Sequence, residues 1–164
     1  MLTALDAPAE TLDDQEKNFA AQVREHGWFR TSVVEDEDGP GFSYTTGLWS
    51  GAAAPEIIVF SLQSETAHNI LWDVYRGVAA GGSLLSAQRV STVFADRQAI
   101  FLPVSKMFYR EYLGWSRWFY GGDDWPCWQL IWPDTRGAFP WESGYEDRFA
   151  KSQPNLTGED WAAI

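Results

Sequence analysis

A charged turn close to two tryptophans is the first place where the residue types could do chemistry. Asp134 and Arg136 stand between Trp132 and Trp141. A turn aspartate commonly accepts hydrogen bonds from the backbone just ahead of it, which would make Asp134 a local cap. The alternative is a charged pair at the mouth of an aromatic pocket, holding a flat or cationic ligand by stacking or cation–π contact. The predicted ligand-binding residues are then Tyr44, Trp132, Asp134 and Trp141.

His26 is the candidate general base, because a histidine can carry a proton near neutral pH. With Asp134 to orient it, or Arg136 to stabilise an anion, it could support hydrolysis of a small substrate. This hypothesis requires the side chains of His26 and Asp134 to converge in space. The simpler interpretation places His26 at the end of a helix, where it interacts with the last carbonyl groups.

The other reactive side chains favour structural roles. His68 lies in an amphipathic pattern and is interpreted as an edge or core histidine. Cys127 begins an apolar strand, which favours burial over nucleophilic reactivity. The chain contains no His-Glu-x-x-His motif, no cysteine pair, no esterase elbow and no phosphate-binding glycine loop. Neither a metal nor a cofactor is therefore predicted.

Hydrophobic periodicity defines the elements that must position these residues. Helices are predicted at residues 11–25, from Ser64 to about residue 80, and at 106–120, with Gly27 ending the first in a left-handed conformation. Strands are predicted at residues 28–34, 42–48, 56–62, 89–94, 99–104 and 128–132. The first two strands predict a hairpin around an acidic turn. The apolar run at 57–60 predicts a central strand that is buried on both faces.

This order of elements predicts a single compact α+β domain. We expect a mainly antiparallel or mixed sheet with about three helices packed on one of its faces. A chain of 164 residues suits one domain. The expected boundaries are a flexible tail at residues 1–10, the domain at 11–150, and a partly ordered tail at 151–164.

Composition limits the partners. The 23 acidic and 12 basic residues give a net charge of −11, which disfavours nucleic acid and anionic lipid and fits a basic protein partner or a small molecule. Mimicry of nucleic acid is a weaker alternative, since the acidic residues are scattered over several loops. A single cysteine and the lack of a signal peptide or a long apolar run favour a cytoplasmic, non-membrane protein. A homodimer remains open.

Several motifs occur in an order that resembles a known bacterial family. They are His26-Gly27-Trp28, the segments 41–49 and 55–60, and a C-terminal set comprising 112–114, 118–121, Gln129, 132–134, Gly137 and 139–141. Together they resemble the family called domain of unknown function 4262, over about residues 14–154. The resemblance implies a small, mostly single-domain protein without an assigned activity. Related sequences often carry a histidine before the Pro55-Glu56 pair, and Ala54 stands there in this chain, which argues against a metal or acid–base role at that position.

The many rings and the lack of a catalytic motif favour a binding or interaction domain that uses an aromatic-lined groove near Trp132 and Trp141. The alternative is the small-substrate hydrolase built on His26 with Asp134 and Arg136. The sequence leaves open whether the protein is an enzyme.

Overall fold

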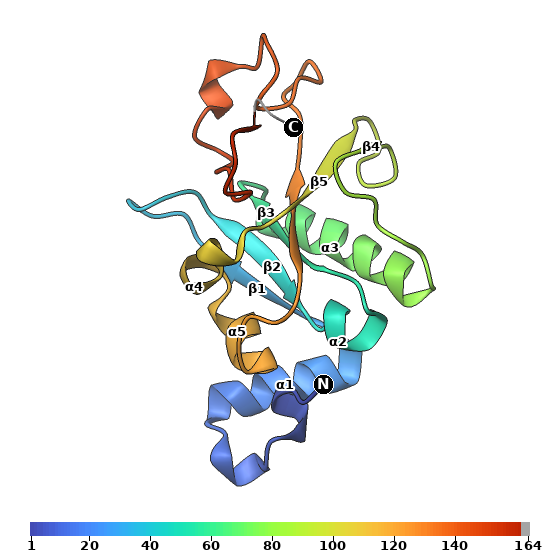
Figure 1. Cartoon of the computed structure of the whole chain (residues 1–164), viewed down its shortest axis with the longest axis vertical. Coiled ribbons are helices and arrows are strands. Elements are labelled where there is room, and N and C mark those ends of the chain that lie inside the picture. The colour runs from blue at the N-terminus through green and yellow to red at the C-terminus, as the bar shows by residue number, and fades with distance from the viewer. Residues whose placement is uncertain (162–164) are drawn as a thin grey trace.

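The fold is a six-stranded mixed sheet with helices on both faces (Figure 1). The computed structural model describes residues 1–161 of the chain. The strand order is β1-β2-β3-β6-β5-β4, and every neighbouring pair is antiparallel except β3 with β6. The strands are β1 (Phe29–Val33), β2 (Phe42–Thr46), β3 (Glu56–Phe60), β4 (Arg89–Val90), β5 (Ala99–Pro103) and β6 (Cys127–Ile131). The predicted α+β class, the mixed sheet and the β1–β2 hairpin are confirmed.

The central strand β3 explains why both faces of the sheet are covered. All five of its residues are buried, as the apolar run predicted. Ile57 and Val59 pack with the apolar side of α3 (Ser64–Ala79). Ile58 and Phe60 pack on the other face with α1 (Asp14–His26) and α5 (Gly114–Tyr120). The expectation that helices occupy one face is therefore wrong, because a strand with two apolar faces must be covered on both.

Helix α1 ends as predicted but begins slightly later. Asp13, not Thr11, is its N-cap: its side chain accepts from the Glu16 N–H, and the Glu16 carboxylate accepts from the Asp13 N–H. Gly27 ends the helix with φ of 82°, in the left-handed region that favours glycine. This stop sets where His26 lies and how the chain enters β1.

Two segments depart from the predicted elements. Residues 89–94 form only the two-residue strand β4, which pairs with β5 at the sheet edge. Residues 106–120, predicted as one helix, divide into a 3-10 turn, α4 (Tyr109–Tyr112) and α5. The break falls at Leu113, which is fully buried with a non-helical backbone, so tertiary packing overrides the local helical pattern. A further short helix, α2 (Leu48–Ala52), lies in the loop between β2 and β3.

The two ends of the chain also contact the domain. Residues 1–12 form two 3-10 turns, Ala4 is buried, and Arg24 donates to the Leu5 carbonyl at 2.8 Å. Near the other end, Leu156 is buried in the same cluster as α1 and α5. No helix in the described part of the chain is long and apolar enough to cross a membrane.

Candidate functional site

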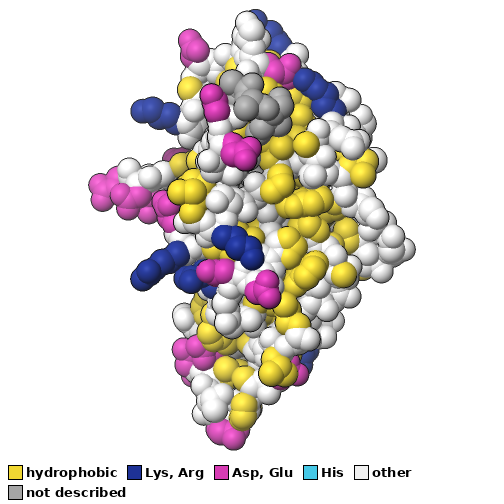
Figure 2. Space-filling view, viewed as in Figure 1, with side chains coloured by type: hydrophobic (Ala, Val, Ile, Leu, Met, Phe, Trp, Pro, Cys, Tyr) yellow, Lys and Arg dark blue, Asp and Glu magenta, His cyan; other side chains and the backbone are white. Residues whose placement is uncertain are grey.

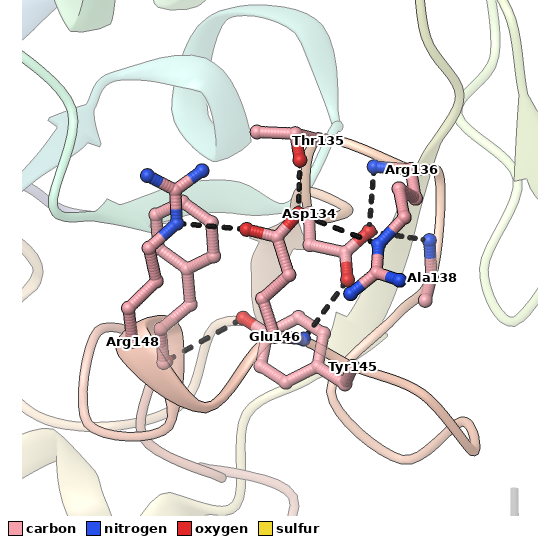
Figure 3. Close-up of polar contacts among 8 residues, drawn as sticks. Asp134, Thr135, Arg136, Ala138, Tyr145, Glu146 and Arg148 are labelled. Atoms are coloured by element: carbon pink, nitrogen blue, oxygen red, sulfur yellow. Dashed lines mark hydrogen bonds and ion pairs between the residues drawn. The ribbon is translucent and has the colours of Figure 1, made fainter.

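Asp134 organises its own loop (Figure 3). One carboxylate oxygen accepts from the N–H groups of Arg136 and Ala138, both at 2.9 Å, and the other accepts from the Glu146 N–H at 3.0 Å. Burial acts to raise the pKa of this carboxyl, but the three backbone hydrogen bonds outweigh it and hold the pKa below its usual value. The side chain is only 2% exposed. The geometry therefore supports the local cap.

Arg136 lies at the surface of the same loop. Its side chain is 73% exposed, and its Nε lies 3.7 Å from the Glu146 carboxylate. That carboxylate also accepts from the Thr135 hydroxyl and pairs with Arg148 at 2.7 Å, which together lower its pKa. Glu146 is thus occupied by its own loop (Figure 3). An exposed arginine beside such a carboxylate has the geometry of a surface ion pair.

The three predicted pocket rings lie in three different hydrophobic clusters. Tyr44 is buried with α5, and its hydroxyl accepts from the Trp115 N–H at 3.1 Å. Trp132 is buried on the α3 face, and its Nε1 donates to the Phe60 carbonyl at 2.9 Å. Trp141 stacks on Phe139 at a ring distance of 5.4 Å in a third cluster. The structure does not bring these rings together around one groove.

His26 and Asp134 lie at opposite ends of the sheet. Strands β1 and β6 both run parallel to β3, since β1 and β3 are each antiparallel to β2. His26 stands just before β1 begins, whereas Asp134 stands just after β6 ends, and β2 and β3 separate the two strands. Figure 1 shows α1 and the segment after β6 at opposite ends of the molecule. The hydrolase hypothesis is therefore wrong, because its base and its orienting acid cannot meet.

A buried carboxyl that the sequence did not single out is Glu56. It is fully buried at the start of β3. The N–H groups of Gly47 and Trp49 donate to its Oε1 at 2.8 and 3.1 Å. The hydroxyls of Thr45 and Tyr120 also donate to the carboxyl, the former at 2.6 Å. Burial outweighs these bonds and raises its pKa. Glu56 ties α2 and α5 to the sheet. Its signals in the sequence were its place in the 55–60 motif and its position as a charged residue that opens an apolar strand.

A groove that brings both histidines together lies where α1, β1 and α3 meet. Its volume is about 650 Å³. The residues that line it from β1 and the position before β1 are Trp28, Phe29 and Arg30. The helices contribute Gln22 and His26 from α1, and His68, Asn69 and Trp72 from α3. We call this hollow the His26–Trp72 groove.

The groove combines aromatic surface with hydrogen-bond donors. The rings of Trp28 and His68 stack at 5.8 Å, and Trp72 lies 6.1 Å from Trp28 with 38% of its surface exposed. The Arg30 guanidinium donates to the Ser64 carbonyl at 2.6 Å, which holds it at the rim. No acidic side chain lines the groove, and the acid nearest to His26 is the exposed Glu25 at 3.7 Å. Such a surface suits a flat group that carries negative charge.

The sequence identified His26 as a candidate but paired it with Asp134, whereas the structure places it in one groove with His68 and Trp72. His68 and Trp72 are one helical turn apart on the polar side of α3, while Ala67, Ile70 and Leu71 account for the buried side. A His–Trp pair four residues apart on the polar side of a helix was the sequence pattern that could have indicated this groove. Among the described residues, no group of three His, Cys, Asp or Glu side chains is placed to hold a metal ion.

The fold and the groove define a small α+β domain with an open surface hollow and a locally ordered acidic loop. The family model described as "Domain of unknown function (DUF4262)" matches residues 22–146. The match covers more than half of the chain, so the chain belongs to this family, as the motifs predicted. It includes the His26–Trp72 groove, Glu56 and the Asp134 loop. The chain matches no curated protein and no solved structure.

Proposed function

We propose that this protein is a binding module and that its site is the His26–Trp72 groove. The ligand group is flat and negatively charged, such as an aromatic ring that bears a carboxylate. The observation that supports this proposal is the composition of the lining: exposed Trp72, two imidazoles and Arg30, without an acidic side chain.

This lining contrasts with the rest of the protein. The chain carries 23 acidic and only 12 basic residues. On the face drawn in Figure 2, acidic side chains gather on the β1–β2 hairpin that projects at the left, where residues 35–38 are exposed. A groove without acids offers a cation no carboxylate to pair with, even in so acidic a protein, and leaves Arg30 as the local charge that an anion meets. The ring of Trp72 adds stacking, which is worth about 0.5–1.5 kcal/mol beyond the area buried.

Binding is proposed in preference to catalysis because the groove offers no nucleophile. Its lining contains no serine, threonine or cysteine. Neither imidazole is held by a buried carboxylate, which a general base needs for orientation.

The test is a titration of the protein with 2-naphthoate, followed by the ¹H–¹⁵N NMR signals of the tryptophan indole groups. We expect the signals of Trp28 and Trp72 to shift, and binding to weaken about tenfold in Arg30→Gln, since a charge-assisted hydrogen bond contributes about 1.5–3 kcal/mol. Arg97→Gln, which removes an exposed arginine outside the groove that packs over Phe94, should bind as the unmodified protein does.

The matched cation, protonated 2-(aminomethyl)naphthalene, is the second control. The proposal is overturned if this cation binds as tightly as 2-naphthoate, or if 2-naphthoate shifts signals only outside the groove.

A further inference from the structure

The open edge of β1 borders the groove. Strand β1 ends one side of the sheet, and no strand among residues 1–161 pairs with its outer side. It has five residues, Phe-Arg-Thr-Ser-Val, without a proline that would prevent pairing. Proteins usually blunt such an edge, because it presents a row of unpaired N–H and C=O groups to other chains. The opposite edge is the two-residue β4, so β1 is the longer of the two.

The register identifies which backbone groups face outward. Ser61 N–H donates to the Gly41 carbonyl at 2.8 Å, which extends the β2–β3 ladder by one pair. Gly41 therefore directs its backbone groups toward β3, and so do the residues two and four positions later. The residues between them, Phe42, Tyr44 and Thr46, direct their backbone groups toward β1. Their β1 partners are Val33, Thr31 and Phe29. Arg30 and Ser32 therefore direct their N–H and C=O groups to the outside.

A second hollow follows the same strand on the other face of the sheet. Its volume is about 470 Å³, and it shares Phe29 and Arg30 with the His26–Trp72 groove. Its other walls include Asp14 and Trp115, and Trp115 stacks on Phe19 at 5.1 Å in the α1–α5 cluster. We call it the Asp14–Trp115 hollow. The open edge thus runs between two hollows that share Arg30 and differ otherwise: the imidazoles line only the His26–Trp72 groove, and Asp14 lines only the second hollow.

Four carboxamide side chains flank this path. Gln15 and Asn18 line the Asp14–Trp115 hollow, while Gln22 and Asn69 line the His26–Trp72 groove. None of the four amides makes a hydrogen bond to another described residue. Carboxamides carry both a donor and an acceptor, as a peptide bond does, so they can pair with the main chain of an extended segment.

We infer that the partner is an extended polypeptide segment that adds to the sheet as a strand beside β1. The inference rests on the proposed function, because it names the carrier of the flat, anionic group. Successive side chains of a strand point to opposite faces. One face of the segment would place acidic and aromatic side chains in the His26–Trp72 groove. The other would place basic side chains over the Asp14–Trp115 hollow, where Asp14 and the rings accept a charged head and its apolar stem.

The probe is the blocked heptapeptide Lys-Glu-Lys-Tyr-Lys-Glu-Lys, which puts every lysine on one face of a strand and the glutamates and tyrosine on the other. Its control has the same composition in the order Lys-Lys-Glu-Tyr-Glu-Lys-Lys, which mixes the faces at the same net charge. By isothermal titration calorimetry we expect the alternating peptide to bind at least tenfold more tightly than the control. Equal affinity would overturn the assignment of the two faces.

The variant pair Ser32→Pro and Ser32→Ala tests the backbone pairing. Both lose the Ser32 hydroxyl, but only proline removes an outward N–H, and proline is tolerated on edge strands. We expect Ser32→Pro to bind the alternating peptide at least tenfold more weakly than Ser32→Ala. Peptides N-methylated at alternate amides give the same information without changing the protein: one alternate set should abolish binding, and the other should leave it intact.

Three results separate this inference from the proposed function. If both Ser32 variants bind the peptide equally and both N-methylated sets behave alike, strand addition is overturned, while 2-naphthoate binding decides the groove independently. If 2-naphthoate fails to bind but the peptide shows the N-methylation pattern, the groove proposal fails and edge pairing stands alone. If sedimentation shows a dimer that Ser32→Pro disrupts, the occupant of the edge is a second copy of this chain, and the peptide inference is overturned.

Discussion

Two buried carboxyl groups in this protein show how burial and hydrogen bonding compete at a single residue. Asp134 receives three backbone N–H groups, and they hold its pKa below the usual value despite its burial. Glu56 also receives several donors, but its complete burial prevails and its pKa is raised. Aligned backbone donors stabilise the charged form, whereas removal from water penalises it. Asp134 therefore favours the fold when ionised, and Glu56 favours it when protonated.

Asp134→Asn should destabilise the fold in a pH-dependent way. The native pKa of Asp134 is lowered, so its stabilisation is fully present above the unfolded value of about 3.9 and is lost as the pH falls through the native value. Urea unfolding should show the variant clearly less stable at pH 7, with the difference shrinking as the pH falls below about 4. The exposed Asp96→Asn is the matched control and should change little. A difference that stays constant at every pH would show that the carboxylate charge plays no part.

At the scale of elements, the connection from α1 into β1 depends on the close approach of two glycines, Gly27 and Gly47. Gly47 has φ of 118°, and a Cβ built on it would lie 2.6 Å from the carbonyl oxygen of Gly27. Its N–H donates to Glu56. The end of α1, the end of β2 and the buried carboxyl thus meet at one point. This contact fixes the start of β1, whose residues Phe29 and Arg30 line the His26–Trp72 groove.

Gly47→Ala should destabilise the protein by more than the roughly 1 kcal/mol that a left-handed conformation alone costs, because the backbone of Gly27 must also move. Gly51→Ala is the control in the neighbouring helix α2. Its Cβ would meet only one atom, at an ordinary 3.8 Å, so it should be neutral or stabilise by about 0.5–1 kcal/mol. Thermal unfolding of the two variants makes the comparison. Equal midpoints would mean that the Gly27–Gly47 approach carries no strain.

The elements were more predictable from the sequence than the site. The end of α1 at Gly27 and the buried β3 were predicted because glycine conformation and local apolar runs determine them. The three rings of the expected pocket were predicted to be neighbours. They lie in separate clusters instead, because strand alternation and sheet order place their side chains on different faces or at different strands. His26 and His68 line one groove because α1 and α3 both pack beside β1. That arrangement joins residues far apart in the sequence, which no local pattern contains.

At the scale of the whole molecule, the folded unit extends beyond the family match. The match ends at residue 146, yet Gln153 and Leu156 are both buried. Gln153 accepts from the Trp132 N–H at 3.0 Å and donates to the Trp132 carbonyl at 2.9 Å. One carboxamide thereby continues the hydrogen-bond pattern of β6 just beyond its last residue. The segment after residue 146 completes the sheet end that carries the Asp134 loop.

Gln153→Ala should therefore destabilise the whole domain and not only its C-terminal segment. It leaves the buried N–H and C=O of Trp132 without partners, and a buried unsatisfied group costs about 1–3 kcal/mol. Gln98→Ala, which removes an exposed glutamine with one long contact to Ser91, is the matched control and should stay within about 0.5 kcal/mol. Native-state hydrogen exchange locates the effect. Faster exchange across β3 and β6 would place the segment after residue 146 in the cooperative unit, whereas faster exchange confined to residues near 153 would make it a separate appendage.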